Sequence, residues 1–197
     1  MPTPTAFLKS FLIIVVATLI GGGLFVYSGS YPMGADSPHN PFTYWVLETL
    51  RERSIARAAS DIQIPDKLNT SDRLLAGGAD YNDMCAGCHL KPGKKESDFT
   101  IGLYPSPPNL TTTADNHGHK HGGSSGMDED ENSAAIQRQF WIIKHGIKAS
   151  GMPAWGPTHS DERIWNMVAF LQRLPTLSEG QYQILTSRGN ATETHDH

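Results

Sequence analysis

The chain has 197 residues, enough for one domain of ordinary size with additional segments but too few for two full domains and a membrane anchor. Its formal net charge is −4, and its lysines and arginines are scattered among acidic residues, which argues against a basic surface and against nucleic acid as a partner.

The N-terminal segment is apolar over the length of a membrane helix. Residues 6–28 contain the uncharged run FLIIVVATLIGGGLFVY, about 17 residues long. Lys9 precedes this run and no charge follows until Asp36, so residues 1–5 are predicted in the cytoplasm and the main domain outside it. A cleaved signal peptide is the alternative, because small residues follow the run. The length of the run and the tyrosines near its end favour a retained single-pass anchor.

The rest of the chain has the composition of helices and loops, without a convincing strand alternation. We therefore expect an all-α fold. Residues 29–41 are rich in glycine, serine and proline and are interpreted as a tether, and residues 42–70 as an accessory helix that packs on the domain or lies near the membrane. The remaining segments are a domain over 71–175, a polar histidine-rich loop within it at 111–132, and a C-terminal tail at 176–197.

Three helices are predicted inside the domain: one that begins near Ser71 and runs into the cysteines, one over 133–145, and one from Asp161 to Leu174. The loops between them are long for so small a domain, and ordering them costs conformational entropy. We expect a large apolar group to fill the interior.

The sequence CAGCH contains the only cysteines, Cys85 and Cys88, followed directly by His89. A thioredoxin-like redox pair would need a βαβ context, which the chain lacks, and a zinc site would have to recruit His117, His119 or His121 at an unusual spacing. Cys-X-X-Cys-His is the pattern of covalent haem attachment, in which the two thiols bond the vinyl groups and the imidazole binds the iron.

A second axial ligand is expected, and methionine is the usual partner of histidine in electron-transfer cytochromes. Met152 lies in a loop between two helices, in the sequence KASGMPAWGP, and is the preferred candidate. The other candidates are Met33, Met84, Met127, Met167, His145 and His159.

These residues together resemble class I cytochromes c, in particular the membrane-anchored, single-haem bacterial members, over about residues 71–175. The resemblance rests on CAGCH, on GMPAW and on PPNL. It implies one covalent haem c, with the Pro108 carbonyl behind the His89 ring, and helix crossing at Gly77 and Tyr81 against Met167 and Phe170. It also implies a cofactor site with the following members: Cys85, Cys88, His89, Pro108, Leu110, Met152 and Trp155.

The function expected from this resemblance is one-electron transfer on the periplasmic side of a bacterial cytoplasmic membrane, not catalysis at the haem. The chain would act as a carrier or as the haem subunit of a larger respiratory oxidoreductase, between a membrane donor and an exported oxidase or reductase. Two alternatives stay open: a haem enzyme or ligand sensor with an open iron position, and a metal-handling protein that uses the histidine-rich loop.

Overall fold

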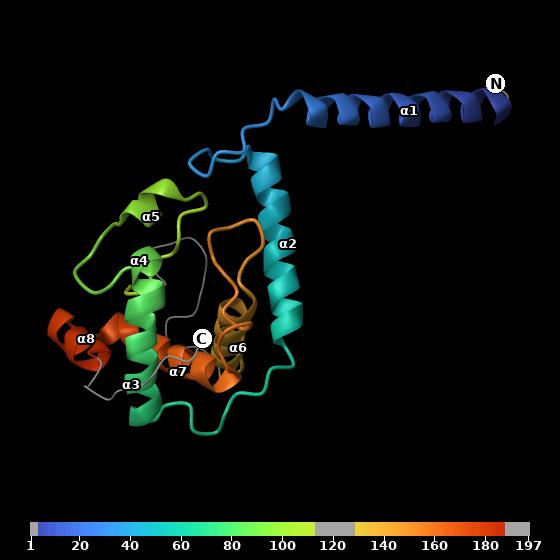
Figure 1. Cartoon of the computed structure of the whole chain (residues 1–197). Helices are drawn as coiled ribbons and strands as arrows, with labels where there is room; N and C mark the ends of the chain where they lie inside the picture. Colours follow the sequence, from blue (N-terminus) through green and yellow to red (C-terminus); the bar gives the residue numbers. More distant parts are fainter. Residues whose placement is uncertain (1–3, 113–128, 188–197) are drawn as a thin grey trace. The chain divides into compact units, whose positions relative to one another are not determined.

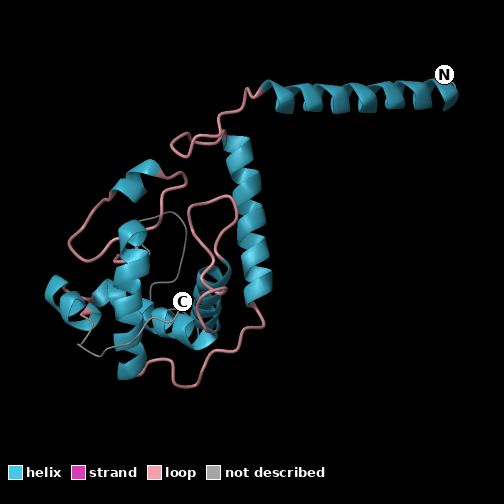
Figure 2. Cartoon of the chain, in the orientation of Figure 1, coloured by secondary structure: helices cyan, strands magenta, loops and turns pink. Residues whose placement is uncertain are grey.

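The computed structural model describes residues 4–112 and 129–187, and every regular element in these ranges is helical (Figure 2). The chain forms two compact units, Met1–Ser37 and Pro38–His197. The prediction of an all-α protein is confirmed.

The first unit contains helix α1, Pro4–Ser28, whose side chains are exposed along its whole length. Its 25 residues correspond to about 37 Å at 1.5 Å per residue, which exceeds the hydrocarbon thickness of a bilayer. By length and composition this helix could cross a membrane, although an N-terminal signal sequence has the same properties. Gly29, at φ 64°, follows its last residue.

Helix α2, Pro41–Ala59, begins the second unit. Asn40 caps it by accepting a hydrogen bond from the Thr43 amide at 2.9 Å, and Pro41 occupies its first position, where a missing amide proton costs nothing. Ile55 and Ala59 are buried, so one side of the C-terminal half faces the domain. The helix packs against α6, Glu129–His145.

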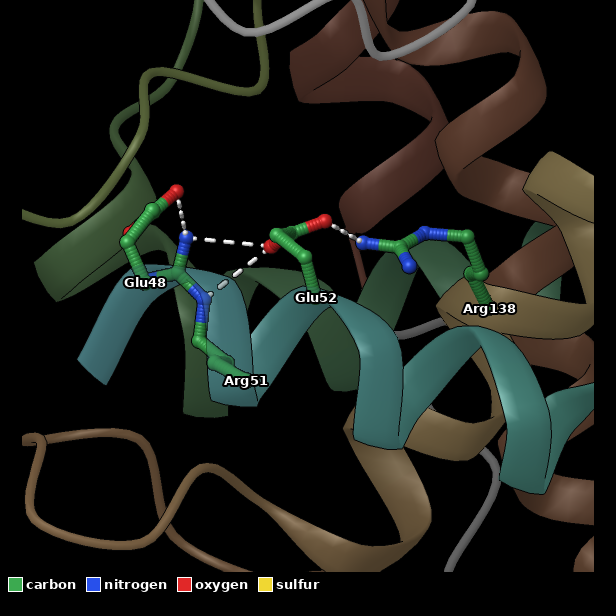
Figure 3. A network of polar contacts seen from close by, with 4 residues as sticks. All are labelled: Glu48, Arg51, Glu52 and Arg138. Atoms are coloured by element: carbon green, nitrogen blue, oxygen red, sulfur yellow. Dashed lines mark hydrogen bonds and ion pairs between the residues drawn. The ribbon is translucent and has the colours of Figure 1, made fainter. Parts of the chain in front are cut away.

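A polar network strengthens the contact between α2 and α6 (Figure 3). The Arg51 guanidinium contacts Glu48 at 2.6 Å and Glu52 at 3.1 Å, and the second carboxylate oxygen of Glu52 accepts a hydrogen bond from Arg138 of α6 at 2.7 Å. These side chains are half-buried, where ion pairs are less screened than in open solvent. The network therefore holds the accessory helix in a defined rotation about its axis.

Helix α3, Ser71–Asp80, crosses α7, Asp161–Arg173, at two adjacent glycines (Figure 1). A Cβ on Gly77 would overlap the backbone of Asn166, and a Cβ on Gly78 would lie 3.0 Å from the Phe170 ring. Beyond the crossing, the rings of Tyr81 and Phe170 are 5.3 Å apart. The crossing is the one that the resemblance to class I cytochromes c implied.

The interior consists of two apolar clusters. The first lies around α6 and α7 and includes the stacked rings of Phe140 and Trp165, 4.1 Å apart. The second joins α3, α7 and the C-terminal helix α8, Glu179–Thr186, through Tyr81, Phe170 and Tyr182. Cys85 packs against both clusters, which places the cysteine motif where they meet.

Three elements differ from the sequence-based expectation. A short helix α5, Asp98–Gly102, begins at a capping box formed by Ser97 and Thr100, and α6 begins at Glu129, before the expected residue 133. The segment interpreted as a C-terminal tail contains α8, which buries Tyr182 against the domain and follows a 3₁₀ turn, Leu174–Thr176. The Ser178–Gln181 capping box is a local signal for α8 that the apolar periodicity alone does not reveal.

Candidate functional site

The cysteine motif lies on a change of helical geometry. After α3 the backbone continues as a π-turn, Tyr81–Cys85, and then as α4, Ala86–His89, which Leu90 ends with φ 68°. π-turns of this kind occur often at functional sites because they redirect the side chains that follow. Cys85, Cys88 and His89 are each half-buried, and both thiols are free.

His89 is held through both its ring and its backbone. Its Nδ1 atom lies 2.9 Å from the Pro108 carbonyl oxygen, and its own carbonyl accepts a hydrogen bond from the Leu110 amide at 3.2 Å. The buried Tyr81 hydroxyl donates to the carbonyl of Leu90 at 2.7 Å. When Nδ1 carries the proton and donates it in a hydrogen bond to the Pro108 carbonyl, the Nε2 lone pair of His89 is available to a metal.

Burial determines the protonation of these groups. It lowers the pKa of His89, against a smaller opposite effect of the hydrogen bond to Pro108, so the ring favours the neutral form that ligates metals. Burial also raises the pKa of the Cys85 thiol to about 12, with further contributions from Asp80 and Cys88. Redox-active cysteines have lowered pKa values, so the environment of Cys85 is unlike that of a thioredoxin-type site.

The methionine loop between α6 and α7 is fixed by its backbone. Gly146 turns at φ 64°, and a Cβ there would lie 2.7 Å from the Met152 carbonyl oxygen, which leaves no room for another residue. The same carbonyl accepts a hydrogen bond from Ile147 at 3.2 Å, and Trp155 and Gly156 donate to the last turn of α6. Met152 itself is half-buried.

Two contacts relate this loop to the rest of the site. A Cβ on Gly151 would lie 2.8 Å from the Leu103 side chain, so the loop lies against the segment that leads to Pro108. The half-buried Trp155 packs on the first apolar cluster, as Cys85 does, and Leu110 packs on the second. Of the predicted site residues, Cys85, Trp155 and Leu110 thus pack on the two clusters. The described contacts include none between His89 and Met152.

The other candidate ligands lie in different surroundings. Met167 is 1% exposed in the core, Met84 packs on the first cluster, and Met33 is 85% exposed. His145 is exposed beside Trp141, and His159 lies edge-on to Trp155. Met127 and the loop histidines His117, His119 and His121 lie outside the described residues. Within residues 4–112 and 129–187, no group of three or more potential metal-binding side chains occurs.

Sequence reasoning missed two features of the site. The Tyr81 hydroxyl bonds backbone carbonyls eight and nine residues further along, and nothing in the local pattern indicates this. Asp80, which is 7% exposed, accepts two hydrogen bonds from Arg163 of α7, at 2.7 and 2.8 Å. This bidentate pair fixes the end of α3 just before the cysteine motif.

The side chains fit a covalently attached haem c. Two free thiols three residues apart, a neutral imidazole oriented through Nδ1, and a thioether in a braced loop are the donors that such a group requires. The apolar side chains around them, including Leu110 and Trp155, suit the faces of a porphyrin. Within residues 4–112 and 129–187, the structure shows no set of thiolates, imidazoles and carboxylates that could hold a structural zinc ion.

Comparison with known proteins agrees with this assignment. Residues 72–171 match the family model described as cytochrome C oxidase, cbb3-type, subunit III. No curated protein and no solved structure matches the chain. The matched region begins at the start of α3 and ends within α7, and so contains the cysteine motif, Pro108 and the methionine loop. The chain therefore belongs to the family of cytochrome c oxidase, cbb3-type, subunit III, and is a c-type cytochrome whose family implies a haem c cofactor and a role in electron transfer.

Proposed function

We propose that the chain is a membrane-anchored, single-haem c-type cytochrome that carries single electrons. The observation that supports this most directly is the 2.9 Å contact between His89 Nδ1 and the Pro108 carbonyl. That contact fixes the tautomer and the orientation of the ring, as the outer partners of metal-bound histidines do. An imidazole so oriented, directly after two free thiols, is prepared to bind haem iron through Nε2.

In this proposal Cys85 and Cys88 would hold the haem through thioethers to its vinyl groups, and His89 and Met152 would ligate the iron. Haem c, when bound, supplies a one-electron couple between ferrous and ferric iron. Pro108 orients His89, while Leu110 and Trp155 exclude water from the buried surroundings of the ligands. A thioether opposite an imidazole raises the reduction potential, which suits a carrier that delivers electrons to an oxidase or reductase.

The braced loop supports a carrier rather than an enzyme. Hydrogen bonds at both ends of the loop and its contact with Leu103 restrict Met152, so little conformational entropy remains to be lost when the thioether binds. With Met152 as a ligand, the iron would have no open position for a substrate. The partners are then redox proteins, a membrane donor and an exported acceptor, and the chain works alone or as the haem subunit of a respiratory oxidoreductase.

Location follows from α1 in this proposal. The helix is long and apolar enough to cross a bilayer, and the single lysine near its start favours a cytoplasmic N-terminus. The haem domain then lies in the periplasm, attached to a bacterial cytoplasmic membrane. Attachment of haem to Cys-X-X-Cys-His outside the cytoplasm agrees with this placement.

The experiment that tests the proposal is binding of carbon monoxide to the ferrous, haem-loaded protein. Slow and incomplete binding, together with a methionine–iron charge-transfer absorbance in the ferric state, is the expected result. Fast, stoichiometric binding to the wild type would show an open iron position, and the chain would then be a haem enzyme or ligand sensor.

A further inference from the structure

The outward face of α2 is apolar and basic, and no part of the described chain covers it. The network of Glu48, Arg51 and Glu52 lies on one side of α2 and reaches Arg138 of α6 through Glu52 (Figure 3). Helical geometry places another set of residues on the opposite side: Phe42, Val46, Leu50, Arg53 and Arg57. Trp45 and Thr49 line one groove with Val46, Leu50, Arg53 and Arg57, and the Trp45 ring lies beside that of Phe42. We call these seven residues the outward face.

The exposed fractions on this face are large for apolar side chains. Phe42 is 72% exposed, Trp45 61% and Leu50 64%, and the rings of Phe42 and Trp45 lie 6.2 Å apart. A shallow apolar groove of about 720 Å³ runs along the face from Trp45 to Ala58. Exposed apolar surface of this kind marks an interaction site, because leaving it in water costs free energy.

The charge on the outward face has one sign. Arg53 and Arg57 are exposed and take part in no ion pair within the described residues, whereas the acidic residues of α2 lie on the side of the network. Aromatic side chains lie at the N-terminal end of the face and arginines at the C-terminal end. This combination is typical of a helix that lies in the interface of a bilayer and contacts anionic headgroups.

The chain length between α1 and α2 supports a bilayer as the occupant. Residues 29–40 connect the two helices, and a flexible, glycine-containing linker of this length spans about 20 Å on average. If α1 crosses the membrane, the aromatic end of α2 is confined near its surface. A bilayer is then the apolar, anionic surface present at the highest local concentration.

We infer that the outward face of α2 binds the surface of the membrane in which α1 is anchored, with Phe42, Trp45 and Leu50 in the interfacial layer and Arg53 and Arg57 on anionic phospholipid headgroups. The network with Arg138 fixes α2 on α6, so this contact also fixes which side of the haem domain faces the bilayer. The inference rests on the membrane anchoring that is part of the proposed function.

The test uses the full haem-loaded chain, one copy per nanodisc, in phosphatidylcholine with about one third phosphatidylglycerol and bromine on the acyl chains near the headgroup. Bromine quenches tryptophan fluorescence on contact. Wild type should show a quenched component that Trp45→Phe removes. Three changes weaken the attraction between the arginines and anionic headgroups: phosphatidylcholine alone, the double variant Arg53→Gln/Arg57→Gln, and 1 M salt, where the Debye length is about 3 Å. Each change should reduce the quenched component at least about twofold.

The matched control is the double variant Lys148→Gln/Arg173→Gln, which removes two exposed positive charges elsewhere and should be quenched like wild type. A chain that enters the nanodisc but shows no quenching of Trp45, or is insensitive to Arg53→Gln/Arg57→Gln, overturns the inference, and a protein partner or second copy then covers the face. A chain that does not enter the nanodisc overturns both the inference and the proposed anchoring.

Discussion

Gly77 of α3 and Asn166 of α7 meet backbone against backbone, with no space for a side chain between them. This close approach lets Tyr81 and Phe170 pack one turn further along, at 5.3 Å between ring centroids. Because the π-turn that ends in Cys85 begins at Tyr81, the helix crossing also sets the position of the cysteine motif.

Replacing Gly77 by alanine should therefore destabilise the domain by about 3 kcal/mol, because the obstructing atoms belong to the α7 backbone and cannot rotate away. Denaturant unfolding of the haem-loaded protein measures this. Gly180→Ala is the matched control, since a Cβ there meets nothing within 4 Å, and it should be neutral or stabilising by up to about 1 kcal/mol. Equal stability of the two variants would contradict the role of the crossing.

Tyr81→Phe should destabilise the domain by about 1–3 kcal/mol, because it leaves the buried carbonyl of Leu90 without its donor. Tyr182→Phe is the comparison. It loses a 3.1 Å hydrogen bond to the partly exposed Asn82, which water can replace, and should cost less than about 1 kcal/mol. Thermal unfolding, followed by haem absorbance, measures the stability of both variants. A larger loss of stability in Tyr182→Phe than in Tyr81→Phe would show that the hydroxyl of Tyr81 does not support the motif.

The double variant Cys85→Ala/Cys88→Ala should carry no haem that survives denaturing electrophoresis, because the chain contains no other cysteine. Each single variant should keep at most one thioether and a weaker haem stain. Haem that acidified organic solvent extracts from the wild type would show that attachment is not covalent.

Met152→Ala should open the sixth position, accelerate carbon monoxide binding and lower the reduction potential, whereas Met152→His should lower the potential without opening the site. Met84→Leu is the control, because Met84 packs on the first apolar cluster and the change nearly conserves volume. Stopped-flow carbon monoxide binding and redox titration are the measurements. Unchanged binding in Met152→Ala would identify another axial ligand.

The intact protein should remain in membranes after alkaline extraction and retain Met1 or Pro2 at its N-terminus. If residues 1–31 are replaced by an ordinary cleavable signal, the haem domain should become soluble, because the 25-residue helix α1 supplies the anchoring hydrophobic surface. A soluble intact protein whose N-terminus lies near Ser30 would identify the segment as a signal peptide.

The sequence by itself determined the features that depend on neighbouring residues. Apolar runs and the residues that bound them revealed the N-terminal helix and the main helices of the domain, and the structure identifies the caps of α3 and α7 as Thr70 and Ser160. The cysteine motif and the loop around Met152 were visible because their chemistry depends on short spacings. The family match over residues 72–171 confirms the c-type cytochrome resemblance, while the role of each site residue stays a prediction.

Only the tertiary structure decided the contacts between distant residues. Arg163 pairs with Asp80 across 83 positions, and Tyr182 of α8 bonds Asn82 across 100. Helical periodicity indicates which face of a segment is apolar but not which partner covers it, because that depends on how the whole chain packs. The same reason explains α2: the sequence showed a helix, and only the fold showed that Glu52 pairs with Arg138 of α6 while Phe42, Trp45 and two arginines remain exposed.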